Sequence, residues 1–154
     1  DPRVGPYYGF GRDQVAGRRP SSGIGTYIIV LLKGKRDLGF VELDDFGTRY
    51  DISIAIGIPE FHGKGLGDEA MTLAIDYAFA DLDWNHLGLQ VFGFNERAIR
   101  LYERLGFRAK RVMKDRVIWE GKKFDWLFMM LMRHDWSKCH SSNTRPNPIT
   151  APIL

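Results

Sequence analysis

The order of hydrophobic and polar residues divides most of the chain into strand-like and helix-like segments. Three short segments rich in β-branched and other apolar residues come first, at residues 27–32, 38–43 and 50–56. Short polar or glycine-containing sequences separate them, which is typical of strands joined by turns. The first half of the chain therefore predicts an antiparallel meander of three strands.

The hydrophobic spacing then changes to a helical period. Apolar residues recur on one face of an amphipathic helix, with Asp68 and Glu69 in its first turn, where acidic side chains suit the helix dipole. These apolar positions are Met71, Ala74, Ile75, Ala78, Phe79 and Leu82. A second helix is predicted over residues 96–105, with Asn95 as its N-cap and Gly106 ending it in the left-handed conformation.

Three further strands complete the pattern. One lies at 87–92, between the helices, and two lie at 108–119 and 122–133, joined by a tight turn at Glu120-Gly121. We interpret the aromatic residues near this end as core: Trp119, Phe124, Trp126, Phe128 and Trp136. The order β-β-β-α-β-α-β-β predicts an α+β fold, or an α/β three-layer arrangement, around a mostly antiparallel sheet.

The two ends of the chain lack such patterns. Residues 1–26 are rich in Gly and Pro and are expected to be irregular. Residues 137–154 form a polar, Pro-rich tail that we expect to be disordered or docked on a partner. A single domain is thus expected over residues 27–136.

Composition narrows the class of protein. The 154 residues carry a net charge of +3, which we interpret as a solvated surface rather than a nucleic-acid site. No apolar run approaches the about 18 residues of a membrane span, and the start lacks the layout of a signal peptide. With its single cysteine, Cys139, the sequence predicts a cytoplasmic protein without nucleic-acid or membrane partners. Cys139 has no evident base beside it, and with His134 and His140 it does not complete a metal site, so no metal is expected.

The stretch PEFHGKGLGDEA, residues 59–70, holds the most distinctive glycines. A phosphate-binding P-loop is disfavoured because Gly57 and Gly63 are one residue too far apart and Gly65 replaces the required Ser or Thr. A dinucleotide fingerprint is disfavoured by the spacing G-x-G-x-G. A helix entry without a ligand stays open. What remains is a strand, a short loop and a helix N-terminus, which together form an anion site.

Two segments resemble signatures of the GNAT N-acetyltransferases. The stretch His62-Gly63-Lys64-Gly65-Leu66-Gly67 is similar to the acetyl-CoA signature, with His62 where the family usually has Gln or Arg. NERAIRLYERLGF, residues 95–107, is similar to the second signature. The sequence after the last turn resembles the branch that includes ribosomal-protein N-terminal acetyltransferases and spermidine acetyltransferases. The resemblance covers residues 27–136 and implies a GNAT-like sheet with helices on both faces.

The resemblance also implies a cofactor site for acetyl-CoA. The glycine-rich loop and helix start would hold its pyrophosphate, and the end of the third strand would hold its pantetheine arm in a splay between two strands. The implied cofactor-binding residues are Ala55, Ile56, Gly57, His62, Gly63, Lys64, Gly65, Leu66, Gly67, Asp68, Asn95, Ala98 and Tyr102. Arg97, Arg100 and Arg104 either reach CoA phosphates or form a solvated basic face.

The chemistry implied is acetyl transfer to a primary amine by direct attack in a ternary complex. Tyr102 stands at the position of the family's acid that protonates the leaving thiolate, and a phenol with a pKa of about 10 can donate at neutral pH. Asp51 and Glu42 are the candidate general bases. Ser53, Glu120 and Asp125 are weaker candidates.

The family normally begins with a strand and two helices that wall the acceptor site. We expect that the first strand and most of the first helix are missing from this sequence, or that another subunit rebuilds this end, which would fit a homodimer. The acceptor would be a small-molecule or peptide amine. The alternative is a CoA-binding sensor or interaction module without catalysis.

Overall fold

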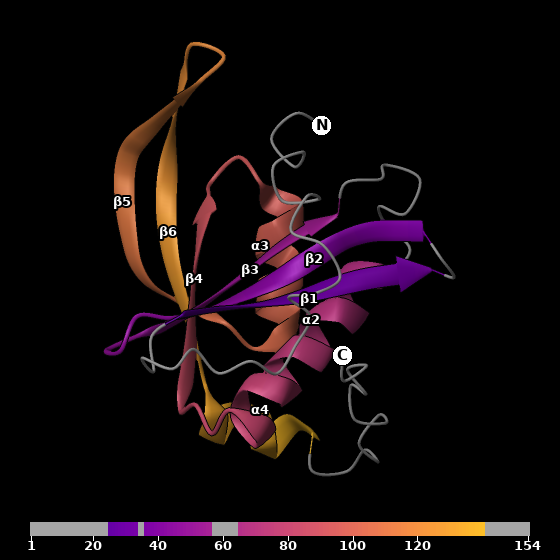
Figure 1. Ribbon diagram of the computed structural model, residues 1–154. Coiled ribbons are helices and arrows are strands. Elements are labelled where there is room, and N and C mark those ends of the chain that lie inside the picture. Colours follow the sequence, from indigo (N-terminus) through magenta and orange to yellow (C-terminus); the bar gives the residue numbers. More distant parts are fainter. Residues whose placement is uncertain (1–24, 34–35, 57–64, 141–154) are drawn as a thin grey trace.

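The computed structural model describes residues 25–33, 36–56 and 65–140, which form a sheet covered by helices (Figure 1). The predicted fold class is confirmed, because the sheet is mixed and mostly antiparallel. The strands are β1 (Gly25–Lys33), β2 (Arg36–Asp45), β3 (Tyr50–Ile56), β4 (His86–Phe92), β5 (Arg108–Trp119) and β6 (Lys122–Met132). The helical segments are α2 (Leu66–Asp76), η3 (Tyr77–Asp81), α3 (Glu96–Leu105) and α4 (Arg133–His140).

The strands of the sheet follow the order β1-β2-β3-β4-β6-β5. Neighbouring strands are antiparallel except β3 and β4, which run parallel because α2 and η3 form the crossover between them. These two strands pair at one position, Asp51 opposite Gly88. Figure 1 shows the consequence: β1–β3 and β4–β6 converge at one place and spread apart from it like the arms of a V.

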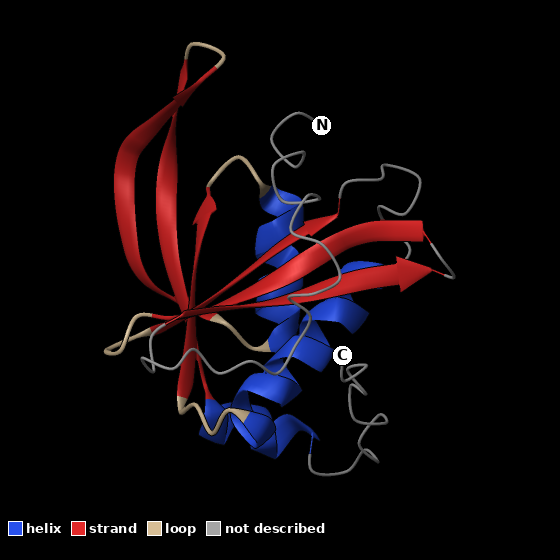
Figure 2. Ribbon diagram, viewed as in Figure 1, coloured by secondary structure: helices blue, strands red, loops and turns tan. Residues whose placement is uncertain are grey.

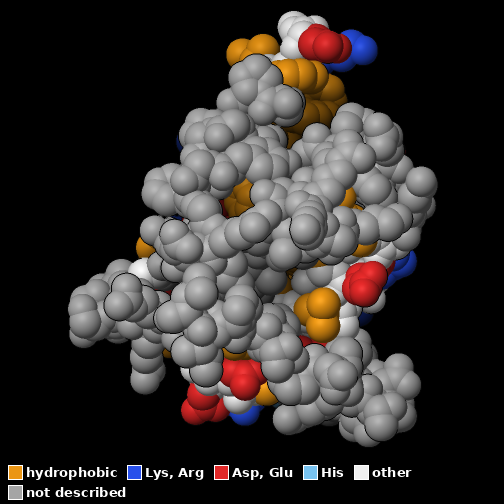
Figure 3. All heavy atoms as spheres, turned by 45° about the vertical axis from the view of Figure 1, so that its right-hand side comes forward, with side chains coloured by type: hydrophobic (Ala, Val, Ile, Leu, Met, Phe, Trp, Pro, Cys, Tyr) orange, Lys and Arg blue, Asp and Glu red, His pale blue; other side chains and the backbone are white. Residues whose placement is uncertain are grey.

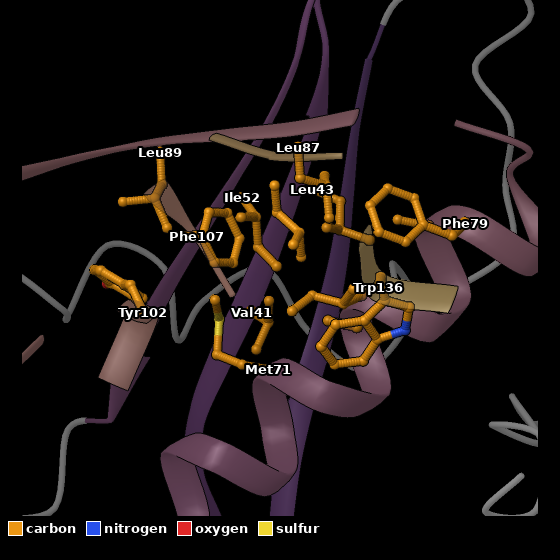
Figure 4. Packing of buried hydrophobic residues seen from close by; sticks show 14 of the residues in the cluster. Val41, Leu43, Ile52, Met71, Phe79, Leu87, Leu89, Tyr102, Phe107 and Trp136 are labelled. Atoms are coloured by element: carbon orange, nitrogen blue, oxygen red, sulfur yellow. The ribbon is translucent and has the colours of Figure 1, made fainter. Parts of the chain in front are cut away.

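One face of the sheet carries the hydrophobic core. Side chains alternate along a strand, so Leu43 opposite Ile52 and Leu87 opposite Leu131 point to the same side. Buried residues that close over them include Met71, Phe79, Tyr102, Phe107 and Trp136 (Figure 4). All four helical segments contribute to this one cluster. A helix on the opposite face, which was also expected, is not found within the described ranges.

The first predicted helix is present but changes its hydrogen bonding at Tyr77. It begins as α2 and continues as η3, a π-helical turn in which the amide of Leu82 donates to the carbonyl of Tyr77 at 3.1 Å. The hydrophobic spacing does not reveal this change, because the apolar positions through Leu82 fit an ordinary α-helical period.

The second helix, α3, begins and ends as predicted. The Oδ1 atom of Asn95 accepts a hydrogen bond from the amide of Ala98 at 3.2 Å. At the other end Gly106 has a φ of 101°, and the amide of Phe107 donates to the carbonyl of Tyr102 at 3.0 Å. Both ends are fixed locally, so the sequence alone specified them.

The β5–β6 hairpin extends beyond the rest of the sheet (Figure 2). Its predicted turn is confirmed, since Glu120 and Gly121 both have positive φ, at 48° and 73°, as in a type I′ turn. Trp119 is 48% exposed, so its interpretation as core is wrong. The reason is that β4 ends at Phe92 opposite Trp126, and no further strand follows it to cover the end of the hairpin. Figure 3 shows hydrophobic side chains at the surface of this projecting end.

The helix α4 was not predicted, and it includes residues 137–140 of the tail that was expected to be disordered or docked on a partner. Trp136 anchors it: this side chain is 4% exposed in the core, and its Nε1 donates to Oδ1 of Asp76 at 2.7 Å. The stability of α4 therefore comes from tertiary packing, which its short polar sequence does not indicate.

No helix in the described ranges is long and apolar enough to cross a membrane.

Candidate functional site

The candidate site begins where β3 and β4 separate. On one side, Ala55 and Ile56 pair with β2, whereas on the other side the pairing with β4 ends at Asp51. The last residues of β3 therefore present a strand edge inside the sheet. Such an edge can hydrogen-bond an extended ligand that carries amide groups. Gly57, predicted next to this edge, lies outside the described residues.

The N-terminus of α2 supplies the second part of the site. Gly65 precedes the helix with a φ of 76°, a left-handed conformation that favours glycine. No side chain caps this end. The amides of Leu66, Gly67 and Asp68 lie in the first turn, where helix geometry provides no intrahelical acceptor. His62, Gly63 and Lys64 lie outside the described residues.

An arginine of α3 lies beside the first turn of α2. The Nη2 atom of Arg104 is 2.9 Å from Oδ2 of Asp68, and both side chains are substantially exposed. Arg100 instead pairs with Glu96 within α3, at 3.4 Å. Of the three arginines considered for phosphate binding, Arg104 is thus brought to a helix N-terminus, where its charge is paired with the Asp68 carboxylate.

Tyr102 lies on α3, one turn beyond Ala98. Its ring meets that of Phe107 edge-on, with centroids 6.0 Å apart, and the residue is 8% exposed. Figure 4 shows it at the margin of the core cluster, near Leu89 and Phe107. Burial raises the pKa of the Tyr102 phenol above its usual value. The phenol is therefore protonated at neutral pH.

Carboxylates gather on the face of the sheet opposite the core. The β2–β3 register places Asp44 opposite Asp51 and Glu42 opposite Ser53. These residues alternate with the core residues Leu43 and Ile52, so they point to the other side of the sheet. Three carboxylates from two neighbouring strands thus share one face.

Asp51 occupies the position where the two arms of the sheet meet. Its Oδ2 is 3.3 Å from Nε of Arg49, and its side chain is 17% exposed. Its Oδ1 is buried and has no hydrogen-bond partner among the described residues. Burial raises the pKa of Asp51, the Arg49 charge opposes this, and repulsion from Asp44 adds to it. A carboxylate with a raised pKa is suited to accept a proton near neutral pH.

Glu42 has a related environment. Burial raises its pKa, and the Asp44 charge raises it further, while a hydrogen bond with the Ser53 side chain lowers it. Both predicted base candidates therefore have raised pKa values on the same face of the sheet. Ser53 acts here as a hydrogen-bond partner of Glu42.

The two candidate bases in the β5–β6 hairpin, Asp125 and Glu120, lie away from Asp51. Asp125 is bound to Lys114, whose Nζ lies 2.8 Å from Oδ2, and this hydrogen bond lowers the pKa of Asp125. Gly88 faces Met130 on β6, and Asp125 is five residues further along that strand, which corresponds to about 17 Å of extended chain. Glu120 lies further still, at the hairpin turn. Neither residue joins the carboxylates around Asp51.

Sequence reasoning missed Arg49 and Gly88. Arg49 precedes β3 and gave no signal. Gly88 stands inside the predicted strand LGLQVF, and a glycine within a strand is a known sign of close approach by another group. In the part of the chain that the structure describes, no three His, Cys, Asp or Glu side chains are grouped to hold a metal ion.

Comparison with known families and proteins agrees with this geometry. Residues 10–108 match the family model described as an acetyltransferase (GNAT) domain. The chain is 32% identical over 102 residues to a spermidine N(1)-acetyltransferase of Escherichia coli K12, covering 66% of this chain and 54% of that protein. It is 29% identical over 94 residues to a putative ribosomal N-acetyltransferase of Bacillus subtilis, covering 61% of this chain and 51% of that protein.

The structure resembles that of the spermidine N-acetyltransferase of Vibrio cholerae solved with CoA and spermine. The TM-score is 0.64 at 26% identity, and the match covers 72% of this chain and 68% of the other. The chain spans about half the length of the curated relatives that it matches.

Proposed function

Because the chain belongs to the GNAT acetyltransferase family, we propose that it transfers an acetyl group from acetyl-CoA to a primary amine by direct attack in a ternary complex. The observation that carries the proposal is the opening of the sheet beyond Asp51 and Gly88. Beyond this pair, β3 has no partner on its β4 side among the described strands. It is followed in sequence by the N-terminus of α2, which no described side chain caps.

Acetyl-CoA would bind along these two elements. Its pyrophosphate would accept hydrogen bonds from the amides at residues 64–68, with the His62 and Lys64 side chains beside it. Arg104, which pairs with Asp68, would lie close to the same helix start. The pantetheine arm would pair with Ala55, Ile56 and Gly57. In this arrangement Asn95 and Ala98 hold the start of α3 next to the cofactor through their own hydrogen bond.

The transfer requires two proton movements. The amine nitrogen attacks the thioester carbonyl carbon, and a carboxylate, Asp51 or Glu42, accepts the amine's proton directly or through water. A backbone N–H at the end of β3 would stabilise the oxyanion. The carbon–sulfur bond then breaks, and Tyr102 donates its phenolic proton to the thiolate, which leaves as free CoA thiol.

The acceptor class follows from the acidic face. A cationic amine would approach the sheet near Asp51, Glu42 and Asp44, where carboxylates attract positive charge before one of them accepts a proton. The relatives named above are a spermidine acetyltransferase and a putative ribosomal acetyltransferase. A polyamine and a peptide with a free N-terminus are therefore the first acceptors to test.

The deciding experiment measures acetyl-CoA binding by calorimetry and then thiol release across a panel of polyamines, peptides and small amines. Tyr102→Phe preserves the ring packing against Phe107 and removes the proton donor. It should lower kcat about 10²-fold or more and leave the KM for acetyl-CoA nearly unchanged. Full activity in Tyr102→Phe would refute the assignment of the acid. Binding without thiol release from any amine would favour the sensor alternative, and absence of binding would exclude both.

A further inference from the structure

The junction of the two arms contains a space that only a glycine leaves open. A Cβ atom added to Gly88 would lie 2.9 Å from Oδ1 of Asp51 and 3.1 Å from Cε2 and Cζ of Phe128. Real Cβ atoms do not approach other atoms as closely as the first of these distances, so alanine at this position would force one of the two side chains to move. The φ of Gly88 is not positive, so the need for glycine comes from this crowding.

Three independent observations meet at this point. Asp51 and Gly88 form the one pair that joins β3 to β4. Oδ1 of Asp51 is buried and has no hydrogen-bond partner in the part of the chain that the structure describes. Phe128 lies on β6 opposite Gln90, so it shares a face with Gly88 and stands diagonally from it. The edge of an aromatic ring is weakly positive and apolar. It can therefore lie against a carboxylate oxygen without taking the place of hydrating water.

We infer that Gly88 is a positioning residue, whose missing side chain leaves the space in which the Asp51 carboxylate lies over β4 against the edge of the Phe128 ring. The consequence for catalysis rests on the proposed function, since it requires Asp51 to act as the base. The packing itself does not depend on that function. In this arrangement Gly88 and Phe128 cover Oδ1, the oxygen that is buried, while Oδ2 stays with Arg49.

Replacing Gly88 by alanine removes none of the charged groups that act on Asp51. Arg49 and His86 lower the pKa of Asp51, and Asp44 raises it, but burial is the largest influence and is upward. A methyl group on residue 88 would push the carboxylate toward solvent. Hydration of the charged form then lowers the pKa of Asp51 toward its ordinary value.

The test is a ¹³C NMR titration of the Asp51 side-chain carboxyl, assigned through the loss of its signal in Asp51→Asn. Gly88→Ala should lower the titration midpoint by roughly half a pH unit or more. Phe128→Leu should also lower the Asp51 midpoint, because the smaller side chain admits water to the carboxylate without adding a clash. If Gly88→Ala does not fold, the midpoint of Phe128→Leu tests the inference instead. Unchanged midpoints in the folded variants would overturn the inference.

Gly93→Ala is the matched control. Gly93 follows β4, and a Cβ there would meet the backbone oxygen of Asp125 at 3.2 Å instead of Asp51. This variant tests for general strain in the same region and should leave the Asp51 midpoint unchanged. An equal shift in Gly93→Ala would overturn the specific role of Gly88.

Activity gives the second readout and separates the two proposals. If Asp51 is the base, the acid limb of the kcat/KM profile should move to lower pH in Gly88→Ala, in step with the NMR midpoint. An NMR shift in a protein that acetylates no amine would support the positioning role and refute the proposed function. An active wild-type protein whose Asp51 midpoint is the same in all variants would support the function and refute the positioning role.

Discussion

Asp51 and Glu42 are carboxylates on adjacent strands that differ in what holds them. Glu42 has a hydrogen-bonding neighbour in Ser53. Asp51 instead has an ion pair at one oxygen, and its other oxygen is buried without a hydrogen-bond partner among the described residues. The two oxygens of Asp51 therefore have opposite effects: the ion pair with Arg49 stabilises the carboxylate anion, and the burial of the other oxygen destabilises it. For Asp51 the burial outweighs the arginine, and its pKa rises.

The first prediction separates the two candidates by pH dependence. Replacing the true base by its amide, in Asp51→Asn or Glu42→Gln, should lower kcat/KM about 10²- to 10⁴-fold and abolish the acid limb of the profile. The other substitution should leave that limb in place. Asp51 is assigned as base if its variant alone loses the limb, and an acid limb retained in both variants would contradict both assignments.

The same pKa shift makes a prediction for stability. Because the folded-state pKa of Asp51 lies above the ordinary value of 3.8, the folded protein binds this proton more tightly than the unfolded chain. The resulting contribution to the free energy of unfolding is fully present below that ordinary value and is lost as pH rises through the folded-state pKa. Asp51→Asn should lack this loss, so urea unfolding at several pH values should show a flatter profile for the variant.

At the scale of elements, some helices are specified by local sequence and others by tertiary packing. The ends of α3 are fixed by Asn95 and Gly106, which act within one turn of the chain. The helix α4 depends on Trp136, whose partner Asp76 is 60 residues away. An element of the first kind can be predicted from a short window, whereas one of the second kind needs the whole fold.

Trp136→Phe tests how α4 is anchored. Phenylalanine keeps most of the buried ring but cannot donate to Asp76, so a partly buried carboxylate oxygen loses its partner. We expect a loss of about 1–3 kcal/mol in the free energy of unfolding, measured by urea denaturation. Trp119→Phe is the control, because Trp119 is 48% exposed and should change stability by no more than about 0.5 kcal/mol. Equal effects of the two substitutions would contradict the anchoring role.

At the scale of the molecule, the sheet is two arms joined through one parallel pair. The arm of β1–β3 carries the acidic face, the arm of β4–β6 carries the long hairpin, and α2 and α3 are linked by the ion pair between Asp68 and Arg104. A ligand that lies in the opening would contact both arms. Its binding should therefore stabilise the whole domain against unfolding.

Acetyl-CoA at about 100 times its Kd should raise the free energy of unfolding by about 2.7 kcal/mol and Tm by about 5–10 °C. Thermal scans with calorimetric determination of Kd provide the measurement. Pantetheine, which has no pyrophosphate, should stabilise less at equal concentration if the N-terminus of α2 holds the phosphates. Equal stabilisation by the two ligands would mean that the N-terminus of α2 does not hold the phosphates.

The sequence by itself determined those features that depend on near neighbours. The order of the six strands and of α2 and α3 follows from hydrophobic period, and the structure confirms it. It also confirms the caps of α3 at Asn95 and Gly106 and the hairpin turn at Glu120-Gly121. The glycine-rich stretch and the second signature also sufficed to indicate the family, because both are short and have fixed spacing. The predicted catalytic and cofactor-binding residues all stay predictions, and four of them, Gly57, His62, Gly63 and Lys64, also lie outside the described residues.

Only the tertiary structure decided which distant residues meet. It separated Asp125 from the acidic face, exposed Trp119, and buried Trp136 through a partner in α2. It also placed Gly88 beneath Asp51 at the junction of the arms, 37 positions further along the chain than its partner. Hydrophobic period and turn residues act over a few positions. The meeting of Asp51, Gly88 and Phe128 instead depends on the crossover through α2 and on the registers of three strands, which no local pattern records.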